Sequence, residues 1–164
     1  IHRLKISDSD SACALLSRRT RLVLRVPRDA VQQVSAALDG CELRIGESSL
    51  RPTRPHQRAL VPWSTVYAHA VVAEDDEGRA IDDEVRFLDL VRAHLDAMGV
   101  GGRAICGRRQ SIDAEGLHGF SLMLDQLDSA ESIRLMERGL GRHRHLGCGV
   151  FVPHKSASAV GAPP

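Results

Sequence analysis

The 164-residue sequence predicts an α+β protein made of tandem ferredoxin-like (RRM-like) βαββαβ units, the first of which lacks its opening strand and helix. Element order is the main observation. Residues 59–155 alternate between strand-like and helix-like patterns in the order strand, helix, strand, strand, helix, strand. Residues 1–58 give strand, strand, helix, strand, which matches the later part of the same unit. Hydrophobic residues make up 43% of the chain and aromatic residues only 3%, so Ala, Leu, Val and Ile must form most of the core.

The elements of the first unit are predicted from the alternation of apolar and polar residues and from the proline and glycine residues at element boundaries. A strand is expected near residues 1–6. Residues 20–26 alternate apolar and polar side chains and are rich in β-formers, which predicts a half-buried strand. Pro27 then opens a helix that ends before Gly40. Two short strands at 42–45 and 48–51 and a linker at 52–57, rich in proline and arginine, complete the unit.

The second unit begins with a strand-like run over residues 60–73, in which Trp63 and Tyr67 are expected to pack in the core. The acidic segment 74–78 is interpreted as a solvated turn. Residues 82–98 form the clearest helix. Its predicted apolar stripe is Val85, Leu88, Val91, Leu95 and Met98. Strands at 102–108 and 117–124, a helix at 129–138, a final strand at 149–153 and a flexible tail at 156–164 follow.

Charge and cysteine content exclude several classes of protein. The formal net charge is only +1, but 20 of the 22 basic residues are arginine, whose fork suits phosphate oxygens. The four cysteines are scattered, without the spacing of a zinc site, so we expect neither a metal nor a cofactor. No signal peptide or membrane-spanning run is visible, which predicts a cytoplasmic protein without a membrane partner.

The most informative segment is the glycine-rich loop, residues 139–149, with the sequence GLGRHRHLGCG. It lies between the last predicted helix and the last predicted strand. A dinucleotide-binding fingerprint requires the opposite order, strand before and helix after, and a Walker loop requires Gly-Lys-Ser/Thr. A loop of this kind can hold an anion between backbone N–H groups and arginine side chains. The alternative is a connection with solvated charges.

In this fold context, Gly-Leu-Gly and Gly-Cys-Gly separated by five residues resemble the RAMP superfamily of CRISPR systems. More closely, the chain resembles the CRISPR-associated repeat-processing endoribonucleases. The segments SRRTRLVLRVP (17–27), LRIG (43–46) and GCGVFVPHK (147–155) fit that family as well. The resemblance covers residues 1 to about 155.

The resemblance implies binding of a CRISPR repeat RNA hairpin and metal-independent cleavage at its 3′ side. The ribose 2′-OH would attack the adjacent phosphate and leave a 2′,3′-cyclic phosphate and a 5′-OH. The product would stay bound as the 3′ hairpin of the crRNA, together with other subunits of a CRISPR effector complex. Two alternatives stay open: a non-catalytic subunit that binds the crRNA hairpin, and a ferredoxin-like domain for small-molecule binding or assembly.

The candidate site residues fall into two groups. The predicted RNA contacts are Gly139, Gly141, Arg142, His143, Arg144, His145, Gly147 and Gly149 in the loop, with Arg108 and Arg109 on a strand and Arg18, Arg19 and Arg21 near another. Many family members carry a catalytic histidine on the first helix of the N-terminal unit. That helix has no predicted counterpart, so it either precedes Ile1 or the general base lies elsewhere. The catalytic candidates are His2, His143 and His145.

Overall fold

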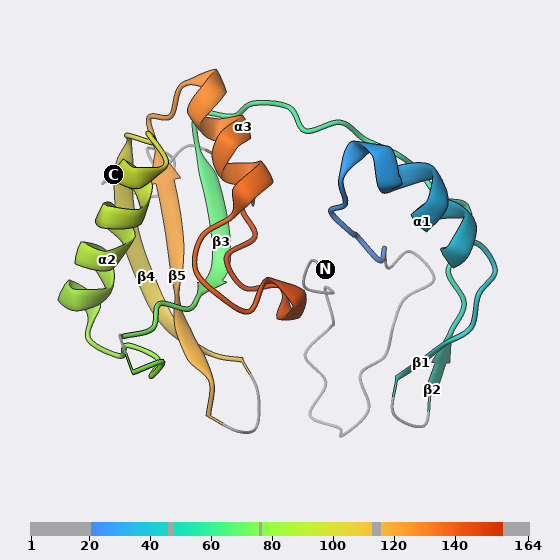
Figure 1. Cartoon of the computed structure of the whole chain (residues 1–164), viewed down its shortest axis with the longest axis horizontal. Helices are drawn as coiled ribbons and strands as arrows, with labels where there is room; N and C mark the ends of the chain where they lie inside the picture. The colour runs from blue at the N-terminus through green and yellow to red at the C-terminus, as the bar shows by residue number, and fades with distance from the viewer. Residues whose placement is uncertain (1–20, 46–47, 76, 113–115, 156–164) are drawn as a thin grey trace, which may run out of the picture. The chain divides into compact units, whose positions relative to one another are not determined.

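The computed structural model describes residues 21–45, 48–75, 77–112 and 116–155. The chain divides into two compact units, Ile1–Ala59 and Leu60–Pro164 (Figure 1). The strand expected at residues 1–6 and the tail at 156–164 lie outside the described residues.

The first unit contains a short 3-10 turn, η1 (Arg28–Ala30), that leads into helix α1 (Val31–Leu38). Strands β1 (Leu43–Ile45) and β2 (Ser48–Leu50) then pair antiparallel. The predicted helix and both short strands are therefore confirmed. The strand predicted at residues 20–26 is wrong over its described part, because residues 21–26 form no regular element. A strand exists only through its partner, and no described strand pairs with this segment.

The second unit has the predicted order of elements. Strand β3 (Val66–Val71), helix α2 (Glu84–Ala97), strands β4 (Arg103–Ser111) and β5 (His118–Asp125), helix α3 (Ser129–Arg138) and strand β6 (Val152–Pro153) follow one another. The sheet has the order β4-β5-β3-β6, and all three pairings are antiparallel. This strand order is that of a ferredoxin-like βαββαβ unit, so the α+β prediction is confirmed here. Both helices contribute to one apolar core with the sheet (Figure 1).

The apolar stripe through which helix α2 packs differs slightly from the stripe that sequence periodicity predicts. The carboxylate of Asp83 caps the helix by accepting the N–H of Arg86 at 2.8 Å. Phe87, Val91 and Leu95 are the buried residues of the helix. Val85, predicted to be in the stripe, is 69% exposed. Leu88 and Met98 pack at the margin of the core, so the true stripe is rotated towards Phe87. No helix in the described part of the chain is long and apolar enough to cross a membrane.

Helix α3 matches its predicted bounds and is held at its start by a capping box. The Asp128 side chain accepts the N–H of Glu131, and the Glu131 side chain accepts the N–H of Asp128. Glu131 also accepts the N–H of Gly101 at 2.7 Å, which ties the helix to the segment before β4. The helix buries Leu135 and Met136.

The polar contacts on the sheet involve residues that the sequence did not single out. The Thr65 hydroxyl donates to Asp125 at 2.7 Å, and Arg103 pairs with the other oxygen of that carboxylate at 3.2 Å. The Thr65 hydrogen bond is the main reason that the pKa of Asp125 lies below its usual range.

Trp63, predicted to be in the core, is instead 47% exposed, because it lies in the irregular segment before β3.

Candidate nucleic-acid interface

The glycine-rich loop is hydrogen-bonded to the backbone of the central strand β3 and of the residues that directly follow it, which we call the extension of β3. The N–H of Gly149 donates to the carbonyl of Ala70 at 2.7 Å, and the N–H of Arg142 donates to that of Val72 at 3.2 Å. The N–H of Leu140 donates to the carbonyl of Gly149 at 3.1 Å and closes the neck of the loop. The loop is therefore part of the sheet framework rather than an independent flexible segment.

Three glycines of the loop are required by close backbone approaches. Gly149 has a φ of 62°, and a Cβ placed on it would collide with the carbonyl oxygen of Leu140. Gly141 has a φ of 74°, and its Cβ would collide with the carbonyl oxygen of Val72. Both positions thus combine a left-handed backbone with a contact that no side chain can share. Gly139, with a φ of 66°, is a third such position, because its Cβ would lie 2.6 Å from the carbonyl oxygen of Gly149. Gly147 also has a positive φ.

The basic insert between the glycines is a folded turn. His143 adopts a left-handed φ of 58°, and Arg144–Leu146 form the 3-10 turn η2. The N–H groups of Leu146 and Gly147 donate to the carbonyls of His143 and Arg144. The sequence predicts an anion held by backbone N–H groups as well as by arginine. Because several N–H groups of the loop are bonded to carbonyls of the loop itself, an anion would contact mainly the side chains. The Arg144 and His145 side chains are exposed.

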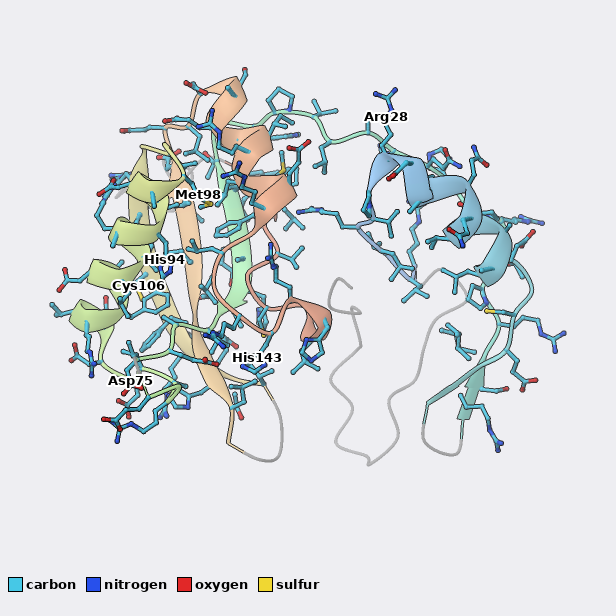
Figure 2. The ribbon with its side chains drawn as sticks, in the orientation of Figure 1. Arg28, Asp75, His94, Met98, Cys106 and His143 are labelled. Carbon is cyan, nitrogen blue, oxygen red and sulfur yellow. The ribbon has the colours of Figure 1, made fainter. Side chains whose placement is uncertain are left out.

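Glu74 joins the extension of β3 to two of the predicted RNA contacts. Its Oε2 lies 3.0 Å from Nε of Arg142, and its Oε1 lies 2.9 Å from Nε2 of His143. The Glu74 side chain is 11% exposed, whereas that of Arg142 is 74% exposed. The prediction that residues 74–78 form a solvated turn is therefore wrong for Glu74, and also for Asp75, whose side chain is 8% exposed. Figure 2 shows His143 and Asp75 at the same end of the second unit.

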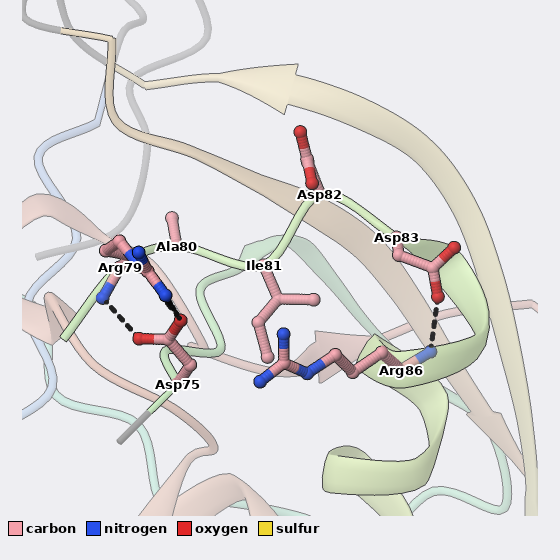
Figure 3. Close-up of a pocket in the computed structure, with 7 residues that line it drawn as sticks. All are labelled: Asp75, Arg79, Ala80, Ile81, Asp82, Asp83 and Arg86. Atoms are coloured by element: carbon pink, nitrogen blue, oxygen red, sulfur yellow. Dashed lines mark hydrogen bonds and ion pairs between the residues drawn. The ribbon is translucent and has the colours of Figure 1, made fainter. Parts of the chain in front are cut away.

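The rest of that turn is stabilised by Asp75. Its carboxylate accepts N–H groups from Glu77 and Arg79 and pairs with the Arg79 side chain, and these contacts, led by the backbone N–H of Arg79, lower its pKa. Figure 3 shows this ion pair among the residues that line a pocket. The pocket is lined by Asp75, Arg79, Ala80, Ile81, Asp82, Asp83 and Arg86. Three carboxylates make it a poor surface for RNA phosphate.

Two further predicted contacts lie on β4. Arg108 and Arg109 are exposed, next to an irregularity in the β4–β5 register between Cys106 and Arg109. Arg109 is opposite Phe120 on β5, and Phe120 is opposite Val71 on β3. Arg109 is therefore level with Val71, at the end of β3 to which the loop is bonded. The two backbones are two strand spacings apart, which is about 10 Å.

The other candidates belong to the first unit or lie outside the described residues. Arg21 is exposed in the first unit, and His2, Arg18 and Arg19 lie outside the described residues. The ring of His145 is 6.0 Å from that of His143, so both histidine candidates of the loop are neighbours. Across residues 21–155, apart from the gaps given above, no group of three or more His, Cys, Asp or Glu side chains is arranged to hold a metal ion.

Comparison with known proteins gives a consistent picture. The chain is 32% identical over 144 residues to the CRISPR-associated endonuclease Cas6 of Myxococcus xanthus, and it spans 60% of the length of that relative. The alignment covers 87% of this chain.

Two solved structures show a weak likeness. Thermus thermophilus Cse3, bound to an RNA representing a pre-cleavage complex, is 15% identical with a TM-score of 0.39, over 64% of this chain and 60% of that one. Cas6e of Escherichia coli is 17% identical with a TM-score of 0.31, over 65% and 69%. Both scores are low, and the fold assignment rests on the strand order given above. The family model described as "Cas6 Crispr" matches residues 1–156, and the chain belongs to the Cas6 family.

Proposed function

We propose that this protein binds CRISPR repeat RNA through the glycine-rich loop and cleaves it without a metal ion. The observation that carries the proposal is the basic insert. Arg142, Arg144 and His145 have exposed side chains on a turn that is fixed to the sheet backbone. Arginine forks on a rigid support suit the oxygens of an RNA phosphate. Membership of the Cas6 family and the similarity to an endonuclease of that family support repeat RNA as the substrate.

Metal-independent RNA cleavage requires a base for the 2′-OH, an acid for the leaving 5′-oxygen, and cations for the phosphorane. The loop offers two imidazoles, His143 and His145, beside two guanidinium groups. A 2′,3′-cyclic phosphate and a 5′-OH are the products of this route. We further propose that the cleaved hairpin stays bound in the cytoplasm with other subunits of a CRISPR effector complex.

The test is cleavage of a labelled repeat hairpin by the purified protein with EDTA in the buffer. Cutting at one position on the 3′ side of the hairpin, with a cyclic phosphate end identified by mass spectrometry, is expected. A substrate with 2′-deoxyribose at the cut position should bind and remain intact, because the attacking hydroxyl is missing.

The alternatives give different outcomes in the same assay. Tight, salt-sensitive hairpin binding with no cleavage would favour a non-catalytic crRNA-binding subunit. Absence of RNA binding, or binding that salt does not weaken, would favour a small-molecule or assembly domain, since phosphate contacts make affinity fall steeply with salt.

A further inference from the structure

The Glu74 carboxylate determines which atoms of the loop side chains remain for a ligand. An ionised carboxylate only accepts hydrogen bonds, so the 2.9 Å contact makes Nε2 of His143 the donor. In the neutral ring, the lone pair is then on Nδ1. Among the described residues, the ring of His145 also lies beside this ring, at 6.0 Å between ring centroids.

Arg142 is likewise held by Glu74 through one side of its guanidinium group. Its Nε is the atom that approaches Glu74, at 3.0 Å. The N–H groups of the two terminal nitrogens lie on a side chain that is 74% exposed, and within the described residues no other ion pair of Arg142 occurs. The guanidinium is therefore fixed through Nε, while its outer edge is available to an anion.

We propose that Glu74 is a positioning residue for RNA recognition, and this proposal rests on the proposed function. It presents the outer edge of Arg142 to a phosphate. It also holds His143 in the tautomer whose Nδ1 can accept a hydrogen bond from a ribose 2′-OH, the group that distinguishes RNA from DNA. Nothing in the local sequence signals this role, because Glu74 and His143 are 69 positions apart.

Charge alone predicts the opposite effect, which makes the proposal testable. A carboxylate near a phosphate-binding surface repels RNA, so its removal should tighten binding. A positioning residue should instead weaken binding when it is neutralised. Glu77 is the matched control: it lies on the same turn, is 70% exposed, and pairs with Arg79 rather than with the loop.

The experiment compares Glu74→Gln with Glu77→Gln in hairpin-binding titrations at one salt concentration. Glutamine has the size of glutamate, and equal thermal unfolding midpoints would show that the fold is kept. We expect Glu74→Gln to bind about threefold more weakly than the unmodified protein, and Glu77→Gln to bind equally or more tightly. Equal or tighter binding by Glu74→Gln would overturn the proposal. Failure of the unmodified protein to bind the hairpin would instead overturn the proposed function.

A second measurement does not depend on RNA. Nitrogen-15 NMR of the histidine rings in alkaline buffer, with the His143 signal assigned from a His143→Gln variant, reports which ring nitrogen carries the proton. We expect Nε2–H in the unmodified protein and a mixture of tautomers in Glu74→Ala. A predominant Nδ1–H form in the unmodified protein would contradict the orientation of His143 on which the inference rests.

Discussion

The N–H of Leu140 and the carbonyl of Gly149 meet at 3.1 Å and close the neck of the glycine-rich loop. The loop leaves and re-enters the framework at this point, so the arrangement of the basic insert depends on the neck. The approach is so close that a Cβ at Gly149 would collide with the Leu140 carbonyl. The neck is therefore the part of the loop where a small change has the largest structural effect.

Gly149→Ala should lower the thermal unfolding midpoint more than Gly78→Ala does. Both glycines have a positive φ, 62° and 77°, so both variants incur a left-handed backbone penalty of about 1–2 kcal/mol. Gly78 has open space around its Cβ position, whereas Gly149 has the Leu140 carbonyl there. The comparison therefore isolates the steric part. Equal midpoints for the two variants would show that the neck can relax.

The double variant Arg142→Ala with Arg144→Ala should weaken hairpin binding by more than about tenfold at moderate salt, because it removes two of the proposed phosphate contacts. The control is Arg86→Ala with Arg92→Ala, which removes the same charge from exposed positions on α2. Unchanged affinity in the loop variant, or an equal loss in the control, would argue against the loop as the RNA contact.

Thr65→Val should destabilise the protein at neutral pH, with an effect that shrinks in acid. The Thr65 hydroxyl is the main cause of the lowered pKa of Asp125. Because the folded pKa is depressed, the stabilisation is fully present above the unfolded value of about 3.9 and is lost as pH falls through the lower folded value.

Urea unfolding from pH 7 down to pH 2 measures this dependence. The difference in unfolding free energy between the protein and Thr65→Val should be constant above about pH 5 and should narrow below about pH 4. Thr53→Val, at an exposed position in the linker, is the control for the change of side chain. A difference that widens in acid would contradict the proposed role of the hydroxyl.

Cys106 should react slowly with alkylating reagents at pH 8. Burial and the nearby charge of Glu84 raise the pKa of its thiol to about 11, so little reactive thiolate is present. Peptide mapping after timed iodoacetamide treatment would give its rate relative to free glutathione. Glu84→Gln should raise that rate modestly, because one of the two causes is removed. A rate equal to that of glutathione would refute the assigned environment.

Much of the second unit could be predicted because its signals are local. The bounds of α3 follow from polar residues at its start and Gly139 at its end, and the structure keeps them. In α2 the sequence predicts the helical period of the apolar residues but not which face of the helix is buried. Val85 and Phe87 both fit a helical stripe, and only packing against the sheet selects Phe87. In the first unit, alternation in residues 21–26 was insufficient, since a strand also needs a partner.

The candidate site was predictable in outline only. Glycine spacing and the basic insert located the loop, and element order placed it between α3 and β6. The contact of Glu74 with Arg142 and His143 had no such signal, because an acidic residue in a polar turn is usually solvated. It depends on the antiparallel return of the chain along β3, which only the folded structure provides.

The loop is attached to β3 through main-chain groups, the carbonyls of Ala70 and Val72. Such anchors do not depend on which side chains the insert carries. Substitutions of the exposed Arg144 and His145 should therefore change the surface of the loop with little effect on folding, as in an antibody loop on its scaffold. The same arrangement would allow the proposed RNA specificity to change while the sheet beneath the loop is retained.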